Sequence, residues 1–157
     1  MMGLRPETLR LCAEAAEDYA VVAACLQDAL MPLREMAYLP HESRFVAVFD
    51  RFMWEHCGGE GCVGRPPFVI QSALRLEKVR AVRVRDIDQA DKRQVLELLT
   101  LASTQDGTLH LTFAGGGVIE ISGEPPFCLL EDIGEPEPTP LVPEHDGDPT
   151  AGKKGGL

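Results

Sequence analysis

A cluster of basic residues stands out in this otherwise acidic chain. Within residues 75–85 five bases accompany a single acid, which gives the segment a formal charge of +4. If the segment is a strand, Arg75, Arg83 and Arg85 share odd parity and therefore lie on one face. Guanidinium groups aligned in this way would form a basic stripe that binds phosphate, carboxylate or an acidic partner.

The alternative is a solvated sheet face on which the arginines pair with acids of neighbouring strands, an arrangement that contributes little energy. The acids that such strands would offer are Glu35, Glu97 and Glu120. Both interpretations require an extended strand at residues 75–85, and they differ in whether the guanidinium groups keep free donors for a ligand.

A second set of residues has the chemistry of a zinc site. His56 and Cys57 precede Cys62 in a segment rich in glycine, and imidazole and thiolate are ligands that zinc prefers. The Cys-x4-Cys spacing is at the limit of the usual pattern, and no second pair completes four ligands. The pattern therefore indicates either a weak metal site or an exposed loop, and a redox-sensing disulfide between the two cysteines is a further alternative.

Motifs of other catalytic classes are absent from the sequence. No Gly-x-Ser-x-Gly motif occurs, and no pair of carboxylates stands out as acid and base. Gly115-Gly116-Gly117 lies between two extended runs and lacks the Lys-Ser or Lys-Thr pair of a phosphate-binding loop. We therefore predict no catalytic residues and no cofactor, which favours a protein that is not an enzyme.

Composition and charge narrow the class of protein. The 157 residues are 45% hydrophobic and 25% charged, as in globular proteins, and the formal net charge of −10 argues against binding to nucleic acid or an anionic membrane. No window approaches the roughly 20 apolar residues of a membrane span, and the start lacks the apolar core of a signal peptide. Five cysteines without a framework fit reduced thiols, so we expect a soluble, cytoplasmic protein.

Periodicity predicts one helix followed by strands. Residues 17–30 place apolar side chains at helical spacing up to Pro32. Period-two runs then predict an antiparallel pair at 33–39 and 45–54, and a long strand from Phe68 with a bulge or break near Lys78–Arg80, where Arg80 takes an inward position. Further strands are expected at 95–102 and, as a hairpin, at 109–113 and 118–121. Pro125 and Pro126 are expected to stop the sheet.

These elements predict an α+β fold, in which the N-terminal amphipathic helix covers an antiparallel sheet of six or seven strands. The sheet would be open or curled into a half-barrel similar to a pleckstrin-homology roll. The expected single domain spans 8–133. Residues 134–157 are predicted to be a disordered tail, because they hold five prolines among acids and lack periodicity.

Three pieces of the chain together resemble a known family. They are the segments EDYAVVAACLQDAL, MAYLPHESRFVAVFDRFMWE and LHLTFAGGGVIEI. In this order and spacing they resemble the domain-of-unknown-function 2948 family of small alphaproteobacterial proteins, over about Leu9 to Gly134. The resemblance implies no activity and no catalytic residues, and it implies a genomic neighbourhood of histidine biosynthesis, near histidinol dehydrogenase. The loop from Cys57 to Cys62 departs from what the family leads us to expect.

The sequence thus supports two functional hypotheses. The first is a non-catalytic interaction or regulatory protein whose basic strand face binds an acidic protein partner. The alternative is a binding protein or enzyme for a small anionic metabolite, held by arginines at the mouth of the sheet. Neither hypothesis involves nucleic acid or a membrane.

Overall fold

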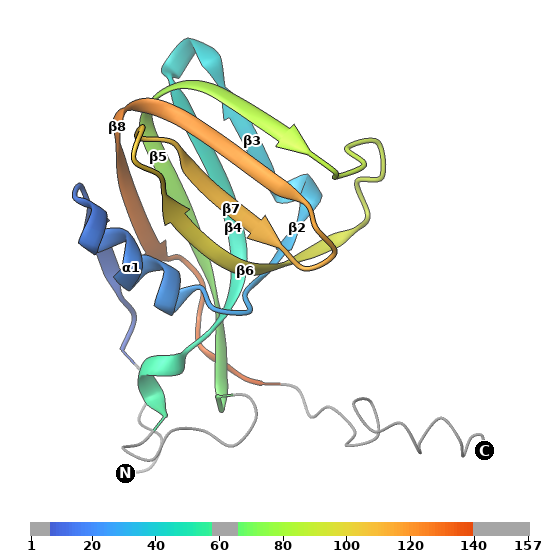
Figure 1. Ribbon diagram of the computed structural model, residues 1–157. Helices are drawn as coiled ribbons and strands as arrows, with labels where there is room; N and C mark the ends of the chain where they lie inside the picture. The colour runs from blue at the N-terminus through green and yellow to red at the C-terminus, as the bar shows by residue number, and fades with distance from the viewer. Residues whose placement is uncertain (1–6, 58–65, 140–157) are drawn as a thin grey trace.

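The computed structural model describes residues 7–57 and 66–139. Within these residues the chain forms one α-helix and nine strands (Figure 1). The helix is α1 (Ala16–Cys25), and the strands are β1 (Arg10–Ala13), β2 (Leu30–Pro32), β3 (Met36–Leu39), β4 (Arg44–Phe52), β5 (Phe68–Arg85), β6 (Val95–Ser103), β7 (Leu109–Phe113), β8 (Val118–Asp132) and β9 (Glu137–Pro138). Single 3-10 turns, η1 (Leu33–Glu35), η2 (Pro40–Glu42) and η3 (Trp54–His56), lie between strands.

All strand pairs are antiparallel, and they follow one another in a ring. The hydrogen-bonded path runs β8, β7, β6, β2, β4 and β5, and β5 pairs with β8 again. The predicted α+β class and curled antiparallel sheet are therefore confirmed, although the ring is not a barrel. The number of strands exceeds the expected six or seven because β1, β2 and β9 are too short to show a period.

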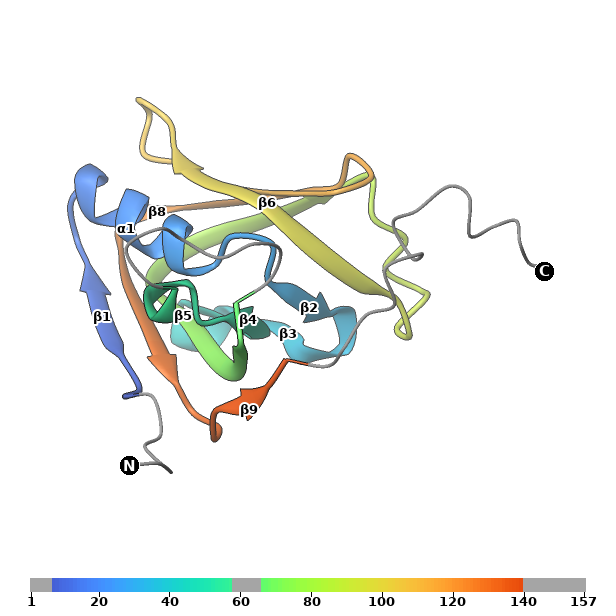
Figure 2. The same ribbon diagram turned by 90° about the horizontal axis from the view of Figure 1, so that it is seen from below.

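The inside of the ring is the hydrophobic core. Inward side chains from several strands, such as Phe45, Leu74 and Ile119, are fully buried in one cluster. The helix contributes Val22 and Leu26 to the same cluster, and Figure 2 shows α1 beside β1 and β6. Burying these groups supplies the main stabilisation, at about 25 cal/mol per Å² of apolar surface.

The helix is shorter than its periodicity predicted. It ends at Cys25, and Asp28 has a positive φ of 61°, so the chain turns before it enters β2 at Leu30. The prediction of a helix through residue 30 is wrong because Leu30–Pro32 pairs with β4 and β6. Backbone pairing with two neighbours outweighs the helical spacing of a few apolar residues.

The predicted bulge in the long strand is confirmed. The register of β5 against β8 shifts on both sides of Val79, and Lys78 has a φ of 62°. Between the two shifts the parity is reversed, so Val79 points into the core while Arg80 is exposed. After the second shift the original parity resumes. The inward position predicted for Arg80 is therefore wrong, because the bulge turns its side chain to solvent.

The second half of β8 corrects one expectation drawn from the sequence. The sheet does not stop at Pro125 and Pro126, since the register with β5 resumes at Phe127 and continues to Asp132. This part of β8 lies between β1 and β5, whereas the first part lies between β7 and β5. The prolines fall in the gap between the paired positions Gly123 and Phe127, where no ladder bond is required of them.

The predicted tail begins too early in the chain. Glu137–Pro138 forms β9 on β5, and the Thr139 backbone N–H donates to the Pro67 carbonyl at 2.8 Å. Edge pairing uses backbone groups, so an acidic, proline-containing segment is able to join a sheet without apolar side chains. Residues 140–157, where the prediction of disorder also applies, lie outside the described residues.

A substitution at Gly123 tests how closely β5 and β8 pack at the bulge. A Cβ at this position would collide with the Lys78 carbonyl oxygen. We expect Gly123→Ala to lower the free energy of unfolding by about 2 kcal/mol, because the two strands must separate to admit the methyl group. Urea denaturation measures the change. Ser122→Ala removes only a long 3.5 Å hydrogen bond and should cost less than about 0.5 kcal/mol. Equal stability of the two variants would contradict this account of the bulge.

Candidate functional site

The three arginines predicted to form a stripe do share the outer face of β5. Arg75 precedes the bulge, and Arg83 and Arg85 follow it, and all three stay outward because the two register shifts cancel. Their side chains are 43%, 77% and 53% exposed, respectively. The bulge, however, places Arg75 in different surroundings from the other two.

Arg75 belongs to a locally neutral network. Its Nε lies 3.0 Å from Glu77 Oε2, and the same oxygen accepts a 2.8 Å hydrogen bond from Arg44 Nε. Arg44 Nη1 also donates to Glu42 at 2.7 Å. Two bases thus face two acids, so this half of the strand has no excess of positive charge to offer a ligand.

Arg83 and Arg85 instead share one carboxylate. Arg85 Nη2 donates to Glu120 Oε2 at 2.5 Å, while Arg83 Nη1 lies 4.0 Å from Glu120 Oε1. Glu120 of β8 is directly opposite Arg83, and its side chain is only 18% exposed. Two guanidinium groups and one carboxylate leave a local charge of +1 and several N–H donors facing solvent.

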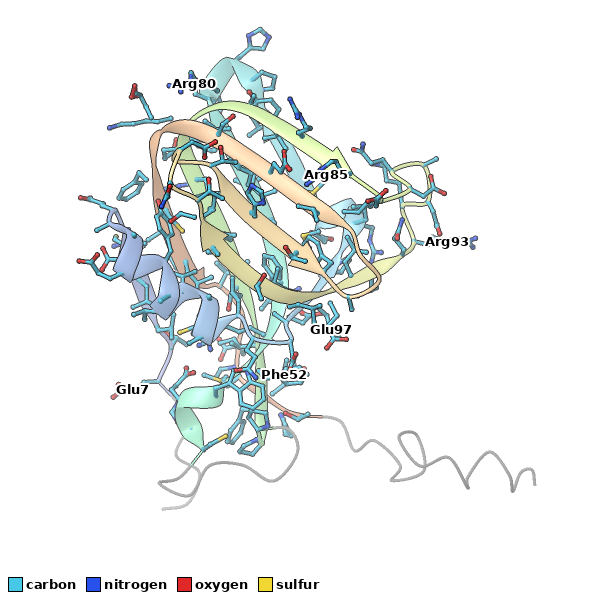
Figure 3. All side chains as sticks on the ribbon, viewed as in Figure 1. Glu7, Phe52, Arg80, Arg85, Arg93 and Glu97 are labelled. Carbon is cyan, nitrogen blue, oxygen red and sulfur yellow. The ribbon has the colours of Figure 1, made fainter. Side chains whose placement is uncertain are left out.

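The surface around this pair is a solvent-facing sheet. Glu120 is flanked on β7 by half-buried His110, and Thr112 of β7 stands opposite Val118 of β8. Figure 3 shows Arg80 and Arg85 at opposite ends of the second half of β5, with α1 on another side of the ring. This face can therefore contact a large partner without any rearrangement of the helix.

The pairing interpretation is confirmed in part. Glu120 is indeed the acid that meets Arg83 and Arg85, but the other two acids named from the sequence play no such role. Glu35 lies 3.9 Å from Arg34, and Glu97 forms no ion pair with a base in the described part of the chain. The sequence did not single out Glu77, because the partner of Arg75 lies on its own strand.

The predicted metal ligands are only partly described. Cys57 takes part in a disulfide bond, and a disulfide sulfur is not the thiolate that zinc requires. His56 ends η3, and Cys62 lies outside the described residues. Among residues 7–57 and 66–139, no three His, Cys, Asp or Glu side chains are grouped so as to hold a metal ion. A zinc site at His56, Cys57 and Cys62 therefore stays a prediction for the reduced chain.

A buried cluster of charges, which was not predicted from the sequence, surrounds Arg51. Arg51 of β4 has no exposed surface, and its guanidinium forms two bidentate pairs. Nε and Nη2 donate to Asp132 at 2.9 Å each, and Nη1 and Nη2 donate to Glu55 at 3.0 and 2.7 Å. The hydroxyl of Ser72 and the backbone N–H of Leu9 donate to the two oxygens of Asp132 at 2.5 and 2.8 Å.

The signal for this cluster was present in the alternation of β4. Phe45, Ala47 and Phe49 point inward, and Arg51 follows in the same phase. An arginine at an inward position implies a buried carboxylate partner, since an unpaired buried charge is very costly. The partner could not be named from the sequence because Asp132 lies 81 residues away.

The surroundings fix the charge state of the buried cluster. Burial alone would raise the pKa of Asp132, but hydrogen bonds from Arg51, Ser72 and Leu9 and the charge of Arg51 hold that pKa below its usual value. Burial would also raise the pKa of Glu55, but the hydrogen bonds and the charge of Arg51 lower it. Burial would lower the pKa of Arg51, but the hydrogen bonds to Glu55 and Asp132 and their charges raise it. No member of the cluster titrates near neutral pH, so it is an anchor for four chain segments and has no role in acid–base catalysis.

The charge state of Asp132 makes stability depend on pH. Because its pKa is lower in the folded protein, its contribution is complete above the unfolded pKa of about 3.9 and is lost as the pH falls through the folded pKa. We expect Asp132→Asn to cost about 3 kcal/mol at pH 7, and this difference from wild type to shrink below about pH 4.

Urea denaturation between pH 7 and pH 2.5 measures this difference. Glu131→Gln is the control, because it removes an exposed 3.6 Å pair with Arg10 and should cost less than about 1 kcal/mol at every pH. A cost for Asp132→Asn that is small at pH 7, or that does not change in acid, would show that the buried pair is not the anchor.

Comparison with known proteins identifies the family. The family model described as a protein of unknown function (DUF2948) matches residues 9–145. No curated protein and no solved structure matches the chain. Among the described residues, α1 and the 3-10 turns all fall short of the length and apolar character that a membrane-crossing helix needs. The chain therefore belongs to the DUF2948 family of proteins of unknown function.

Proposed function

We propose that this protein is a non-catalytic interaction protein that binds an acidic partner through Arg83 and Arg85. The observation that carries the proposal is that these two guanidinium groups share the single carboxylate of Glu120 on an uncovered sheet face. Arg75, which the sequence grouped with them, is not part of the proposed site because its charge is balanced locally.

The geometry suits recognition of a carboxylate or phosphate group on a large partner. Arg83 is 77% exposed and meets Glu120 only at 4.0 Å, so most of its five donors remain available. Glu120 holds Arg85 at 2.5 Å and limits its motion, which lowers the entropy cost of binding. Such contacts set specificity and association rate, and they weaken as salt increases.

The face is also continuous, and it lies on the convex outer side of the ring. The outward row from Arg83 passes through Glu120 to His110 across three neighbouring strands, with no helix above it. A convex outer face favours a protein partner over the small anionic metabolite of the alternative hypothesis, which would need a concave site. The family resemblance makes histidinol dehydrogenase the first partner to look for. The free thiols of Cys12, Cys25 and Cys128 favour the cytoplasm as the place to look, whereas the disulfide of Cys57 does not.

Substitution of both arginines tests the proposal. Tagged wild type and the Arg83→Ala/Arg85→Ala double variant are used for affinity purification from the native cell, with quantitative mass spectrometry of the recovered proteins. We expect at least one partner to fall about tenfold or more in the double variant, because loss of central arginines typically costs more than 1 kcal/mol.

The control variant must lose two positive charges at another place on the surface. Arg10→Ala/Arg75→Ala removes two arginines that pair with Glu131 and Glu77, outside the proposed site. This control should recover the same partners as wild type within about twofold. An identical set of partners from all three proteins would reject the interaction site at Arg83 and Arg85.

A further inference from the structure

A cleft at the other end of β5 has the opposite electrostatic character. It encloses about 450 Å³ between β2, β4 and β5 and the chain that leaves β8. The backbone N–H groups of Ile133 and Gly134 both donate to the Gln71 carbonyl, at 2.9 and 3.3 Å, and Glu137 then pairs with Val69. Figure 2 shows this turn from the end of β8 into β9. The cleft wall thus includes residues that the sequence analysis assigned to the tail.

The lining combines an apolar floor with an acidic rim. Phe52 and Ile70 are buried, Leu30 and Val69 are half-buried, and Figure 3 places Phe52 at the lower end of the molecule. The polar lining residues are Asp50, Gln71, Glu135 and Glu137, and no base is among the lining residues that the structure describes. An anionic metabolite, the ligand class suggested by the sequence, would be repelled here.

Two carboxylates of the rim lack a balancing charge. Asp50 and Glu137 form no ion pair with a base within the described residues, whereas the arginines of β4 and β5 all do. Burial, and then the charges of Glu35 and Glu137, raise the pKa of Asp50 above its usual value. A bound cation would relieve this repulsion and restore the carboxylates to their ordinary acidity.

The spacing of the acids indicates what kind of cation fits. Within the described residues no three of these acidic side chains approach closely enough to hold a metal ion. A site of several hundred cubic ångströms with an apolar floor matches the usual size and lining of small-molecule pockets. An alkyl chain would cover the floor while a cationic head group reaches the carboxylates, as lysine and arginine side chains do at surfaces.

We propose that this cleft binds a small organic cation, with an ammonium or guanidinium group at the Asp50 and Glu137 carboxylates and an apolar body against Leu30, Phe52 and Val69. The site is independent of the interaction surface at Arg83 and Arg85, which lies beyond the bulge on the same strand. It gives the protein a ligand of opposite charge to the proposed partner.

Amide NMR titration of the full chain tests the site with cadaverine (1,5-diaminopentane) as the probe. We expect saturable shifts centred on Val69, Gln71 and Gly134. Asp50→Asn and Glu137→Gln should each weaken binding about tenfold, as expected for loss of a charge-assisted contact. Asp50→Asn should fold normally, because it removes a carboxylate that is repelled by its neighbours.

Controls distinguish a built site from general attraction to an acidic protein. Glu124→Gln removes one negative charge from an exposed side chain next to Arg80, so its affinity for cadaverine should match wild type within about twofold. The neutral 1,5-pentanediol and the anion glutarate should produce no saturable shift. Shifts spread over the whole surface, equal weakening by Glu124→Gln, or no saturable binding of cadaverine would overturn the proposal.

Discussion

The structure depends on the pairing of Arg51 with Asp132. The ring closes where β5 meets β8, and this pair joins the inward side of β4 to the end of β8 at that closure, with Ser72 of β5 between them. Glu55 ties η3 to the same guanidinium. Removing these charges from water is costly, and the cluster is favourable only because almost every donor and acceptor is satisfied. An apolar cluster would hold the strands without fixing their register as strictly.

The interior of a ring closed in this way has few polar groups that could bind a ligand or react with one. The inward side chains of the described strands are apolar except for the anchor, and they are packed as one core. The two surfaces proposed above lie outside this core, on the outer side of the ring, where α1 covers only the side near β1 and β6. The outer face of β5 is divided by the bulge at Lys78–Arg80, and the surplus positive charge lies on the side of the bulge away from the acidic cleft. One strand thus carries two surfaces of opposite charge.

The parts that could be predicted from the sequence are those governed by local patterns. Alternation in Leu109–Phe113 and glycines at Gly115 and Gly116, which adopt φ values of 93° and 100°, fix the hairpin before β8. The slip of parity near Lys78 likewise revealed the bulge. In contrast, β2 and β9 exist because an existing strand offers a free edge, and no local pattern encodes this. The cluster of Arg51 and the cleft at Asp50 escaped prediction for the same reason, since their members come together only when distant strands pair.

The net charge shows that composition alone does not reveal which charges lie close together in the folded protein. The value of −10 argued against nucleic acid and anionic membranes for the chain as a whole, and the local +4 of residues 75–85 argued for an acidic partner or an anionic ligand. In the folded protein Glu120 and Glu124 of β8 lie against Arg83, Arg85 and Arg80 and cancel two of these four units, and the pair of Arg83 and Arg85 keeps one unit. Meanwhile Asp50 and Glu137, unremarkable in the sequence, line one cleft whose described residues include no base. Because screening limits electrostatic attraction to about 8 Å at physiological salt, local imbalances of this kind bear more on ligand binding than the total charge does.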